Sequence, residues 1–233
     1  MSKLSVLRHF LGKQRCVLCH DSAANCTLCN ACRGDIEQLY TDINTLCPRC
    51  AAVSTGGIVC GHCQLKPPPF KALWGSVYYE PPISSMLHAL KYQADLSMLE
   101  PLTSLMLSHP PPWIEQVRFD AILAVPMSDT RRLEHGFNQS DEIAQYISNC
   151  YNVPLLSRHT VYRYHTAPQS TLKQLDRHRN LRKAFRVDVN VKKRNLLLID
   201  DVTTTGATFY TLARILKQAG AGAIYCWSLA RAK

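Results

Sequence analysis

The sequence predicts an α/β protein with a mainly parallel sheet, preceded by a small cysteine-rich metal domain. Strand-like and helix-like runs alternate along residues 67–233. Nine of the 11 cysteines lie between residues 16 and 63. Between the two regions, Lys66-Pro67-Pro68-Pro69-Phe70 is typical of a stiff linker. We therefore expect one domain over residues 1–66 and a second over residues 67–233.

The elements of the larger domain follow from its hydrophobic patterning. Short apolar runs predict strands at residues 73–79, 119–125, 195–200 and 223–230. The run at 195–200 is almost continuously apolar, which is typical of a strand buried on both faces of a parallel sheet. Longer stretches with helical spacing predict helices at residues 83–91, 96–107, 139–151 and 208–219.

The clustered cysteines form an internal repeat. The motif C-x2-C-x9-C-x2-C occurs twice, with an offset of 31 residues. Two cysteines three apart on a tight turn direct both sulfurs at one ion, and two such turns complete a tetrahedral Zn²⁺ site. We predict two structural zinc sites with the ligands Cys16, Cys19, Cys29 and Cys32, and Cys47, Cys50, Cys60 and Cys63.

Other pairings fit the same spacing. The four turns could interleave, and Cys26/Cys29 could replace Cys29/Cys32, although the register of the repeat favours the latter. A disulfide framework would need an oxidising compartment, and the first residues are not typical of a secretory signal. No apolar run reaches the roughly 20 residues that span a bilayer. We therefore expect a cytoplasmic protein without a membrane span.

The strongest functional motif is the segment 197–208. A buried strand ends at Asp200 and Asp201, ahead of a hydroxyl-rich turn and a helix. Such a turn presents unpaired N–H groups and the positive end of a helix dipole, which favour phosphate. The two carboxylates can accept hydrogen bonds from a vicinal diol such as that of ribose. Helix capping explains one Asp or Thr, but not two acids, four threonines and a glycine.

This segment resembles the phosphoribosyl-pyrophosphate (PRPP) motif of type I phosphoribosyltransferases, and other segments narrow the resemblance to the ComF/GntX family. Pro126 with the run Gly136-Phe137-Asn138-Gln139-Ser140 is similar to the family's VP…RGFNQS loop. The stretch from Arg163 to Phe185 resembles its R…T..Q..L….R..NL..AF segment, and Lys91-Tyr92 matches its LKY. The family's layout, a cysteine-rich N-terminus before a phosphoribosyltransferase domain, covers residues 16–231. The resemblance implies a sheet of the type I phosphoribosyltransferase kind.

The resemblance implies roles for named residues. Asp200 and Asp201 would hold the ribose hydroxyls of PRPP, directly or through Mg²⁺. The 5′-phosphate would lie on Thr203, Thr204, Thr205, Gly206, Ala207 and Thr208. The pyrophosphate would meet Pro126, Met127, Ser128, Arg131 and Arg132. The family often has Arg where this chain has His135, which is only partly charged near neutral pH. Anion binding would be weaker or pH-dependent if that side chain meets pyrophosphate, and unchanged if it faces solvent.

Positive charge is concentrated late in the chain. The net charge is +10, and residues 158–194 hold 11 Lys or Arg against two acids, with aromatic residues interleaved. This composition suits single-stranded nucleic acid. On charge alone, a solvated helix face over residues 172–184 and an active-site loop explain it better. The family's association with DNA uptake shifts the balance toward single-stranded DNA, with the candidates Arg163, Lys173, Arg177, Arg179, Arg182 and Lys183.

We therefore expect a ComF-type competence protein that acts in DNA uptake during natural transformation. It would bind single-stranded DNA, a PRPP-type phosphosugar with Mg²⁺, and proteins of the competence machinery. An active Mg²⁺-dependent phosphoribosyltransferase on an unidentified base is the alternative, although no general base is identifiable in the sequence. A zinc-ribbon adaptor whose α/β domain has lost its ligand is the third hypothesis.

Overall fold

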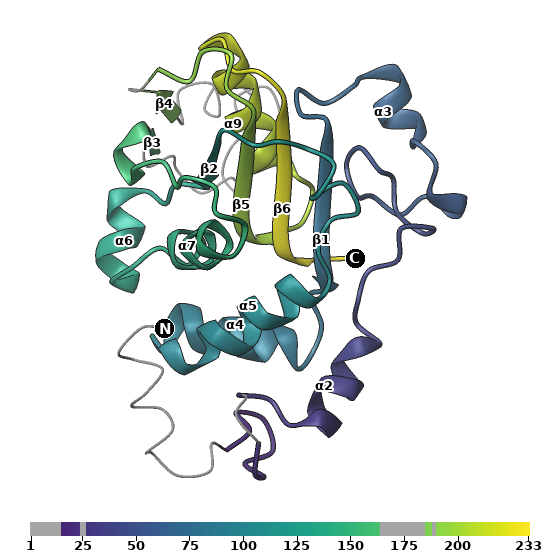
Figure 1. Cartoon of the computed structure of the whole chain (residues 1–233), viewed down its shortest axis with the longest axis vertical. Helices are drawn as coiled ribbons and strands as arrows, with labels where there is room; N and C mark the ends of the chain where they lie inside the picture. The colour runs from purple at the N-terminus through teal and green to yellow at the C-terminus, as the bar shows by residue number, and fades with distance from the viewer. Residues whose placement is uncertain (1–14, 24–26, 164–184, 188–189) are drawn as a thin grey trace, which may run out of the picture.

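The computed structural model describes residues 15–23, 27–163, 185–187 and 190–233 (Figure 1). Its centre is a four-stranded sheet in which every neighbouring pair is parallel. This confirms the α/β class and the parallel sheet that the sequence predicts. The strands, in their spatial order, are β1 (Ala72–Tyr78), β6 (Ile224–Arg231), β5 (Leu196–Thr203) and β2 (Ala121–Ala124).

Two hydrophobic clusters cover the two faces of this sheet. Alternate residues of β5 point to opposite faces, so Leu197 and Ile199 belong to one cluster and Leu196 and Leu198 to the other. Helices α4, α5 and α7 pack in the first cluster, and α9 packs in the second. The helices are α4 (Ile83–Tyr92), α5 (Leu99–Ser108), α6 (Asp129–His135), α7 (Gln139–Tyr151) and α9 (Ala207–Gln218), with 3-10 turns η2 (Leu96–Met98) and η3 (Arg158–Thr160).

The four predicted strands and the four predicted helices of the larger domain are present, with shifts of a few residues at their ends. The helix expected over residues 96–107 starts as η2, where Asp95 accepts a hydrogen bond from the backbone N–H of Ser97 at 3.0 Å. Helix α6 and the antiparallel pair β3 (Val161–Arg163) and β4 (Phe185–Val187) were not predicted. Helix α6 buries none of its residues, so it carries no apolar stripe that periodicity could detect.

The cysteine-rich region contains α2 (Asn30–Glu37), η1 (Thr55–Gly57) and α3 (Gly61–Leu65). Figure 1 shows its first part near α4 and α5, and its second part beside β1. Leu28 and Ile36 belong to the first hydrophobic cluster, which contains α4, α5 and α7, and Leu46 belongs to the second, which contains α9. The boundary at residue 66 stays a prediction, and both hydrophobic clusters extend across it.

The segment between the two cysteine groups covers an edge of the sheet. Tyr40 forms an antiparallel bridge with Val77 of β1, and the Thr41 hydroxyl donates to the Gly75 carbonyl at 2.6 Å. An exposed edge strand offers unpaired backbone groups to other chains, and this segment occupies them. Among the described residues, no helix is long and apolar enough to cross a membrane.

Candidate functional site

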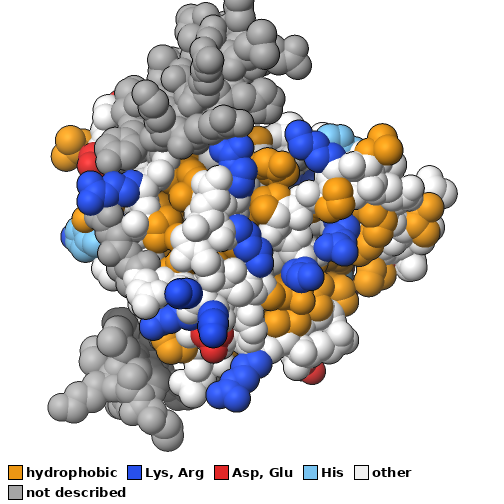
Figure 2. Space-filling model, turned by 90° about the horizontal axis from the view of Figure 1, so that it is seen from above, with side chains coloured by type: hydrophobic (Ala, Val, Ile, Leu, Met, Phe, Trp, Pro, Cys, Tyr) orange, Lys and Arg blue, Asp and Glu red, His pale blue; other side chains and the backbone are white. Residues whose placement is uncertain are grey.

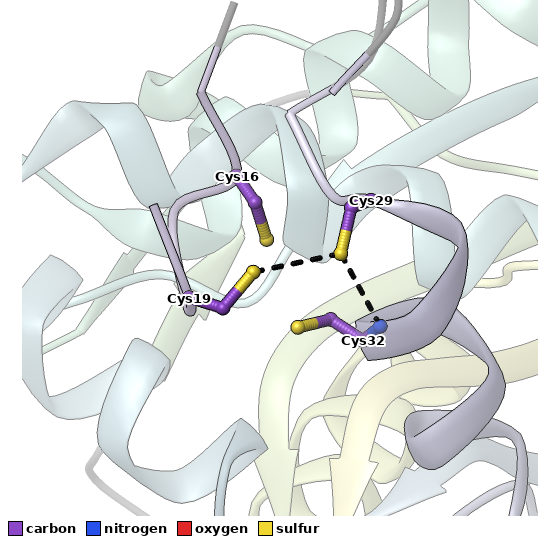
Figure 3. Close-up of side chains that lie close together, drawn as sticks. All are labelled: Cys16, Cys19, Cys29 and Cys32. Carbon is purple, nitrogen blue, oxygen red and sulfur yellow. Dashed lines mark hydrogen bonds between the residues drawn. The ribbon is translucent and has the colours of Figure 1, made fainter. Parts of the chain in front are cut away.

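Each cysteine repeat brings its four sulfurs together. Within each group the ligand atoms all lie within 4.8 Å of one another, and the groups are sequential: Cys16, Cys19, Cys29 and Cys32, then Cys47, Cys50, Cys60 and Cys63. Figure 3 shows the first group, in which the sulfurs of Cys19 and Cys29 are 3.6 Å apart. In a tetrahedral zinc site with Zn–S bonds near 2.3 Å, sulfurs lie about 3.8 Å apart. The donor set therefore fits Zn²⁺. Cys26 lies outside the described residues.

Backbone N–H groups prepare the sulfurs to carry negative charge. Cys29 caps α2 and accepts from the N–H of Cys32 at 3.5 Å, and Cys47 accepts from the N–H of Cys60 at 3.3 Å. Burial opposes ionisation of Cys16, yet backbone N–H groups outweigh it and lower its pKa to about 6. The pKa of Cys47 falls to about 7 by the same balance.

Two other thiols of the second group resist losing their protons, and a bound zinc ion would remove this resistance. Burial and the neighbouring sulfurs raise the pKa of Cys50 to about 11, and burial and sulfur repulsion also raise the pKa of Cys63. Four thiols that resist ionising together form four thiolates once a divalent cation lies among them. A bound Zn²⁺ would contribute folding free energy as a closed structural centre.

A pocket of about 390 Å³ lies where the strands of the sheet end, and we call it the carboxyl-edge pocket. It collects side chains from α4, α6, α7, β5 and α9, which are distant in the sequence. Ligands of open α/β sheets bind outside the carboxyl ends of strands, so its place is the expected one. Its lining is Lys91, Tyr92, Val125, Pro126, Met127, Arg131, His135, Asn138, Gln139, Ser140, Arg163, Asp200, Asp201, Val202 and Thr208.

Two adjacent carboxylates form the floor of this pocket. The Ser140 hydroxyl donates to Asp200 Oδ1 at 2.8 Å, and the N–H of Asp201 donates to the same oxygen at 3.0 Å. Lys91 Nζ lies 2.5 Å from Asp201 Oδ2. Burial, followed by repulsion from Asp201, raises the pKa of Asp200 to about 7, although Ser140 and Lys91 oppose the shift. The pair therefore favours a cation between its carboxylates and the solvent.

The turn after β5 is shaped for close approach of an anion. Gly206 is the N-cap of α9 with φ 72°, in the left-handed region that glycine enters without strain. Thr204, Thr205 and Ala207 are exposed there, and the first turn of α9 leaves N–H groups without intrahelical partners. The Thr203 side chain, by contrast, is only 3% exposed because Thr203 pairs with Arg231 inside the sheet.

The predicted pyrophosphate loop divides between the pocket and its support. Pro126, Met127 and Arg131 line the carboxyl-edge pocket. Ser128 is buried as the N-cap of α6, and Arg132 Nη2 donates to Asp141 Oδ2 at 2.9 Å instead of facing the pocket. The loop thus offers one cation to the pocket and uses the other to tie α6 to α7.

His135 lines the pocket rather than facing bulk solvent. Its Nδ1–H donates to the carbonyl of Lys91 at 3.1 Å, and its ring meets that of Tyr92 edge-on at 5.5 Å. His135 therefore holds the end of α4, and with it Lys91, against the pocket wall. The place of Lys91 in the site was not predicted, although the match of Lys91-Tyr92 to the family's LKY motif was a usable signal.

Of the nucleic-acid candidates, Arg163 is described, and it faces the carboxyl-edge pocket. Its Nη1 donates to the Pro126 carbonyl at 3.5 Å, and its guanidinium lies 5.5 Å from the centre of the Phe185 ring. Burial, followed by repulsion from Arg131, lowers its pKa. The other candidates, Lys173, Arg177, Arg179, Arg182 and Lys183, lie outside the described residues.

The described residues combine two groups of four cysteines with a parallel α/β sheet that has an acidic pocket at its strand ends. The protein is therefore an α/β protein with a cysteine-rich N-terminal region suited to metal binding. The chain is 34% identical over 208 residues to the DNA utilization protein YhgH of Escherichia coli K12, covering 88% of this chain and 90% of that protein. It is 28% identical over 227 residues to competence protein F of Haemophilus influenzae, covering 94% and 97%. The chain therefore belongs to the family of these DNA utilization and competence proteins, the ComF/GntX family.

Other comparisons are more distant. Competence protein ComFC of Bacillus subtilis is 26% identical over 202 residues, which cover 84% of this chain and 80% of that protein. No family model matches the chain. Among solved structures, glutamine PRPP amidotransferase from B. subtilis aligns with 55% of this chain and 25% of its own, at 16% identity and a TM-score of 0.38. Likeness of that size supports no inference about the ligand.

Proposed function

We propose that this protein acts in the use or uptake of DNA, and that its carboxyl-edge pocket binds PRPP or a related phosphosugar with Mg²⁺. One observation carries the proposal. The acidic pair Asp200 and Asp201, the start of α9 and the cations Lys91 and Arg131 converge on one pocket. Its volume of about 390 Å³ lies within the usual range of ligand sites.

Each part of the pocket matches one part of such a ligand. Bound Mg²⁺ would neutralise charge shared between Asp200, Asp201 and oxygens of the ligand, as it usually combines few protein ligands with substrate oxygens. The carboxylates orient the ribose hydroxyls by accepting their hydrogen bonds. The exposed turn at residues 204–207 holds the 5′-phosphate with backbone N–H groups. Arg131, beside Pro126 and Met127, faces the pyrophosphate.

Lys91 has two roles in this proposal. In the free protein it compensates the charge of Asp201 across a distance of 2.5 Å. When a cation binds the carboxylates, the ammonium group is free to contact phosphate oxygens nearby. On binding, the Asp201 carboxylate would pair with the metal and the Lys91 ammonium with phosphate oxygens, so neither side chain would be left with an unpaired charge.

The DNA part of the proposal rests on the relatives and on charge. The relatives are named for DNA utilization and for competence. The chain itself carries a net charge of +10, which favours a polyanionic partner. We include single-stranded DNA and other proteins of DNA uptake as partners, and the cytoplasm as the location, in the proposal.

Calorimetric titration with PRPP tests the pocket. We expect the wild type to bind PRPP with Mg²⁺, and to bind at least tenfold more weakly with chelator. Asp201→Asn removes a carboxylate of the pocket and should abolish the heat of binding. Asp42→Asn, an exposed carboxylate in the segment between the two cysteine groups, is the matched control and should bind normally, because the amide oxygen can still accept from the N–H of Asn44. A wild type that gives no heat with PRPP and Mg²⁺ would overturn the assignment of this pocket.

Genetic complementation tests the link to DNA. A strain that lacks the gene, supplied with wild type or Asp42→Asn, should regain transformation by marked linear DNA. Asp201→Asn should fail to restore it at equal protein levels. Full recovery with Asp201→Asn would show that DNA uptake does not need the pocket.

A further inference from the structure

The edge of the sheet at which the strands begin carries a cationic surface, which we call the amino edge. Figure 2 looks onto this side and shows many Lys and Arg side chains on the described surface, with few acidic ones. Its exposed members come from segments that precede β1, β2 and β5 or end α9. They are Lys71, Arg118, Lys192, Lys193, Arg194 and Lys217.

The centre of the amino edge is a rigid turn before β5. Lys192 bridges to Ala221, the N–H of Lys193 donates to the Gly220 carbonyl at 2.8 Å, and the N–H of Gly222 donates to the Arg194 carbonyl at 2.8 Å. Lys193 itself has φ 60°. These backbone bonds fix the backbone of three consecutive cationic residues, so binding has to order their side chains but not the turn itself.

The charge of this turn is not compensated within the described part of the chain. Among the described residues, Arg118, Lys192, Lys193 and Arg194 form no ion pair. Asp120, which lies directly before β2, accepts a hydrogen bond from the backbone N–H of Asn195 at 2.7 Å. Exposed cations that form no ion pair within the protein are available to neutralise the phosphates of a nucleic acid.

Two hollows open beside this turn and share Asp120 and Pro154 as a common wall. The first, of about 510 Å³, is lined by Lys192, Lys193 and Arg194. The second, of about 450 Å³, which we call the aromatic hollow, is lined by the aromatic rings of Phe119 and Tyr151, by apolar side chains, and by the polar Arg118, Asp120 and Asn152. Of the two rings, Phe119 is 9% exposed and Tyr151 is partly exposed. Aromatic rings continue behind it, because Phe119, Trp113 and Tyr225 meet with centroids 4.8–6.1 Å apart.

We infer that the amino edge binds a single strand of DNA, with its phosphates on the turn 192–194 and a base in the aromatic hollow. A cationic track beside an aromatic hollow suits a strand whose bases are unpaired, because the bases of a duplex are paired and stacked and cannot enter a hollow. The inference rests on the DNA part of the proposed function and names the surface that performs it.

This surface is separate from the carboxyl-edge pocket. Six residues of a strand path separate Arg194 from Asp200, which at about 3.3 Å per residue is about 20 Å. A bound strand and a bound phosphosugar can therefore occupy the protein together. The sequence pointed to residues 158–194 as a whole, and the structure assigns the end of that stretch to the opposite edge of the sheet.

Fluorescence anisotropy with labelled oligo-dT tests the inference. The variant Lys192→Gln/Lys193→Gln/Arg194→Gln should bind roughly 100-fold more weakly at 0.1 M salt, and its salt slope should fall by about 2, since each phosphate contact contributes about 0.7 to the slope. The matched control Arg15→Gln/Arg33→Gln/Lys233→Gln makes the same charge change away from the amino edge. It should bind within threefold of wild type.

The outcomes separate this inference from the proposed function. Wild type that fails to bind oligo-dT would remove the DNA-binding part of both. Wild type that binds, with the amino-edge variant binding equally well at an unchanged melting temperature, would overturn only the amino edge. An unlabelled duplex or polyglutamate that competes as well as unlabelled oligo-dT would show a general polyanion surface and refute the single-strand assignment.

Discussion

Replacing Asp200 with asparagine should stabilise the ligand-free protein at alkaline pH while removing a carboxylate from the pocket. The native pKa of Asp200 is about 7, against an ordinary value of 3.8, because burial and Asp201 disfavour its charged form. A native carboxyl with a raised pKa binds its proton more tightly than the unfolded chain does. Stability therefore falls as pH rises from about 4 to about 7, and stays lower above that window.

The magnitude follows from the same shift. One pKa unit corresponds to about 1.4 kcal/mol, so the wild type should lose about 3 kcal/mol between pH 5 and pH 8 through this group. The asparagine side chain of the variant cannot ionise, and its amide oxygen can still accept from Ser140 and from the N–H of Asp201. The advantage of Asp200→Asn over wild type should therefore grow by about 2–3 kcal/mol from pH 5 to pH 8.

Urea unfolding of both proteins at the two pH values measures this difference. Loss of zinc at low pH affects wild type and variant alike, so it cancels in the comparison. The reasoning would be refuted if the difference in unfolding free energy between Asp200→Asn and wild type were the same at pH 5 and pH 8. It would also be refuted if the variant lost stability relative to wild type as the pH rises. The gain would also show that the pocket is built for its ligand at a cost to the stability of the free protein.

Three further outcomes are expected. Lys91→Met leaves Asp201 without its cation and should cost about 1–2 kcal/mol in urea unfolding; unchanged stability would show that the ion pair contributes nothing. Gly206→Ala should cost about 1 kcal/mol, or 2–4 °C in Tm, through its φ of 72°, since the added Cβ would meet only Leu73 at 3.9 Å; a raised Tm would contradict this. Metal analysis should find two zinc ions per chain, two in Cys26→Ser and one in Cys47→Ser/Cys50→Ser, and a loss in Cys26→Ser would place Cys26 among the ligands.

The metal groups and the sheet could be predicted because their signals are local. A cysteine pair on one turn and an apolar run of six residues are each defined by neighbouring residues, so both could be recognised from the sequence. The repeat left sequential and interleaved groupings of the sulfurs open, and the structure shows the sequential one. The motif at 197–208 was similar, since strand, turn and helix start follow one another directly. The structure places Asp200, Asp201 and Thr208 around one pocket.

The contacts between distant segments could not be predicted in this way. Lys91 meets Asp201 only because α4 and β5 end at the same edge of the sheet. Thr203 looked like a further phosphate ligand in the run of threonines, but β5 continues through it and pairs it with Arg231. The amino edge likewise combines residues 71, 118 and 192–194, which share no motif and meet through the parallel order of the strands.

A crystal structure with PRPP and Mn²⁺ in place of Mg²⁺ tests the central claim most directly. Anomalous scattering would locate the metal without reference to the ligand. We predict a metal peak at the carboxylates of Asp200 and Asp201, with the 5′-phosphate on the turn before α9. A metal peak elsewhere, or PRPP bound outside the carboxyl-edge pocket, would contradict the account.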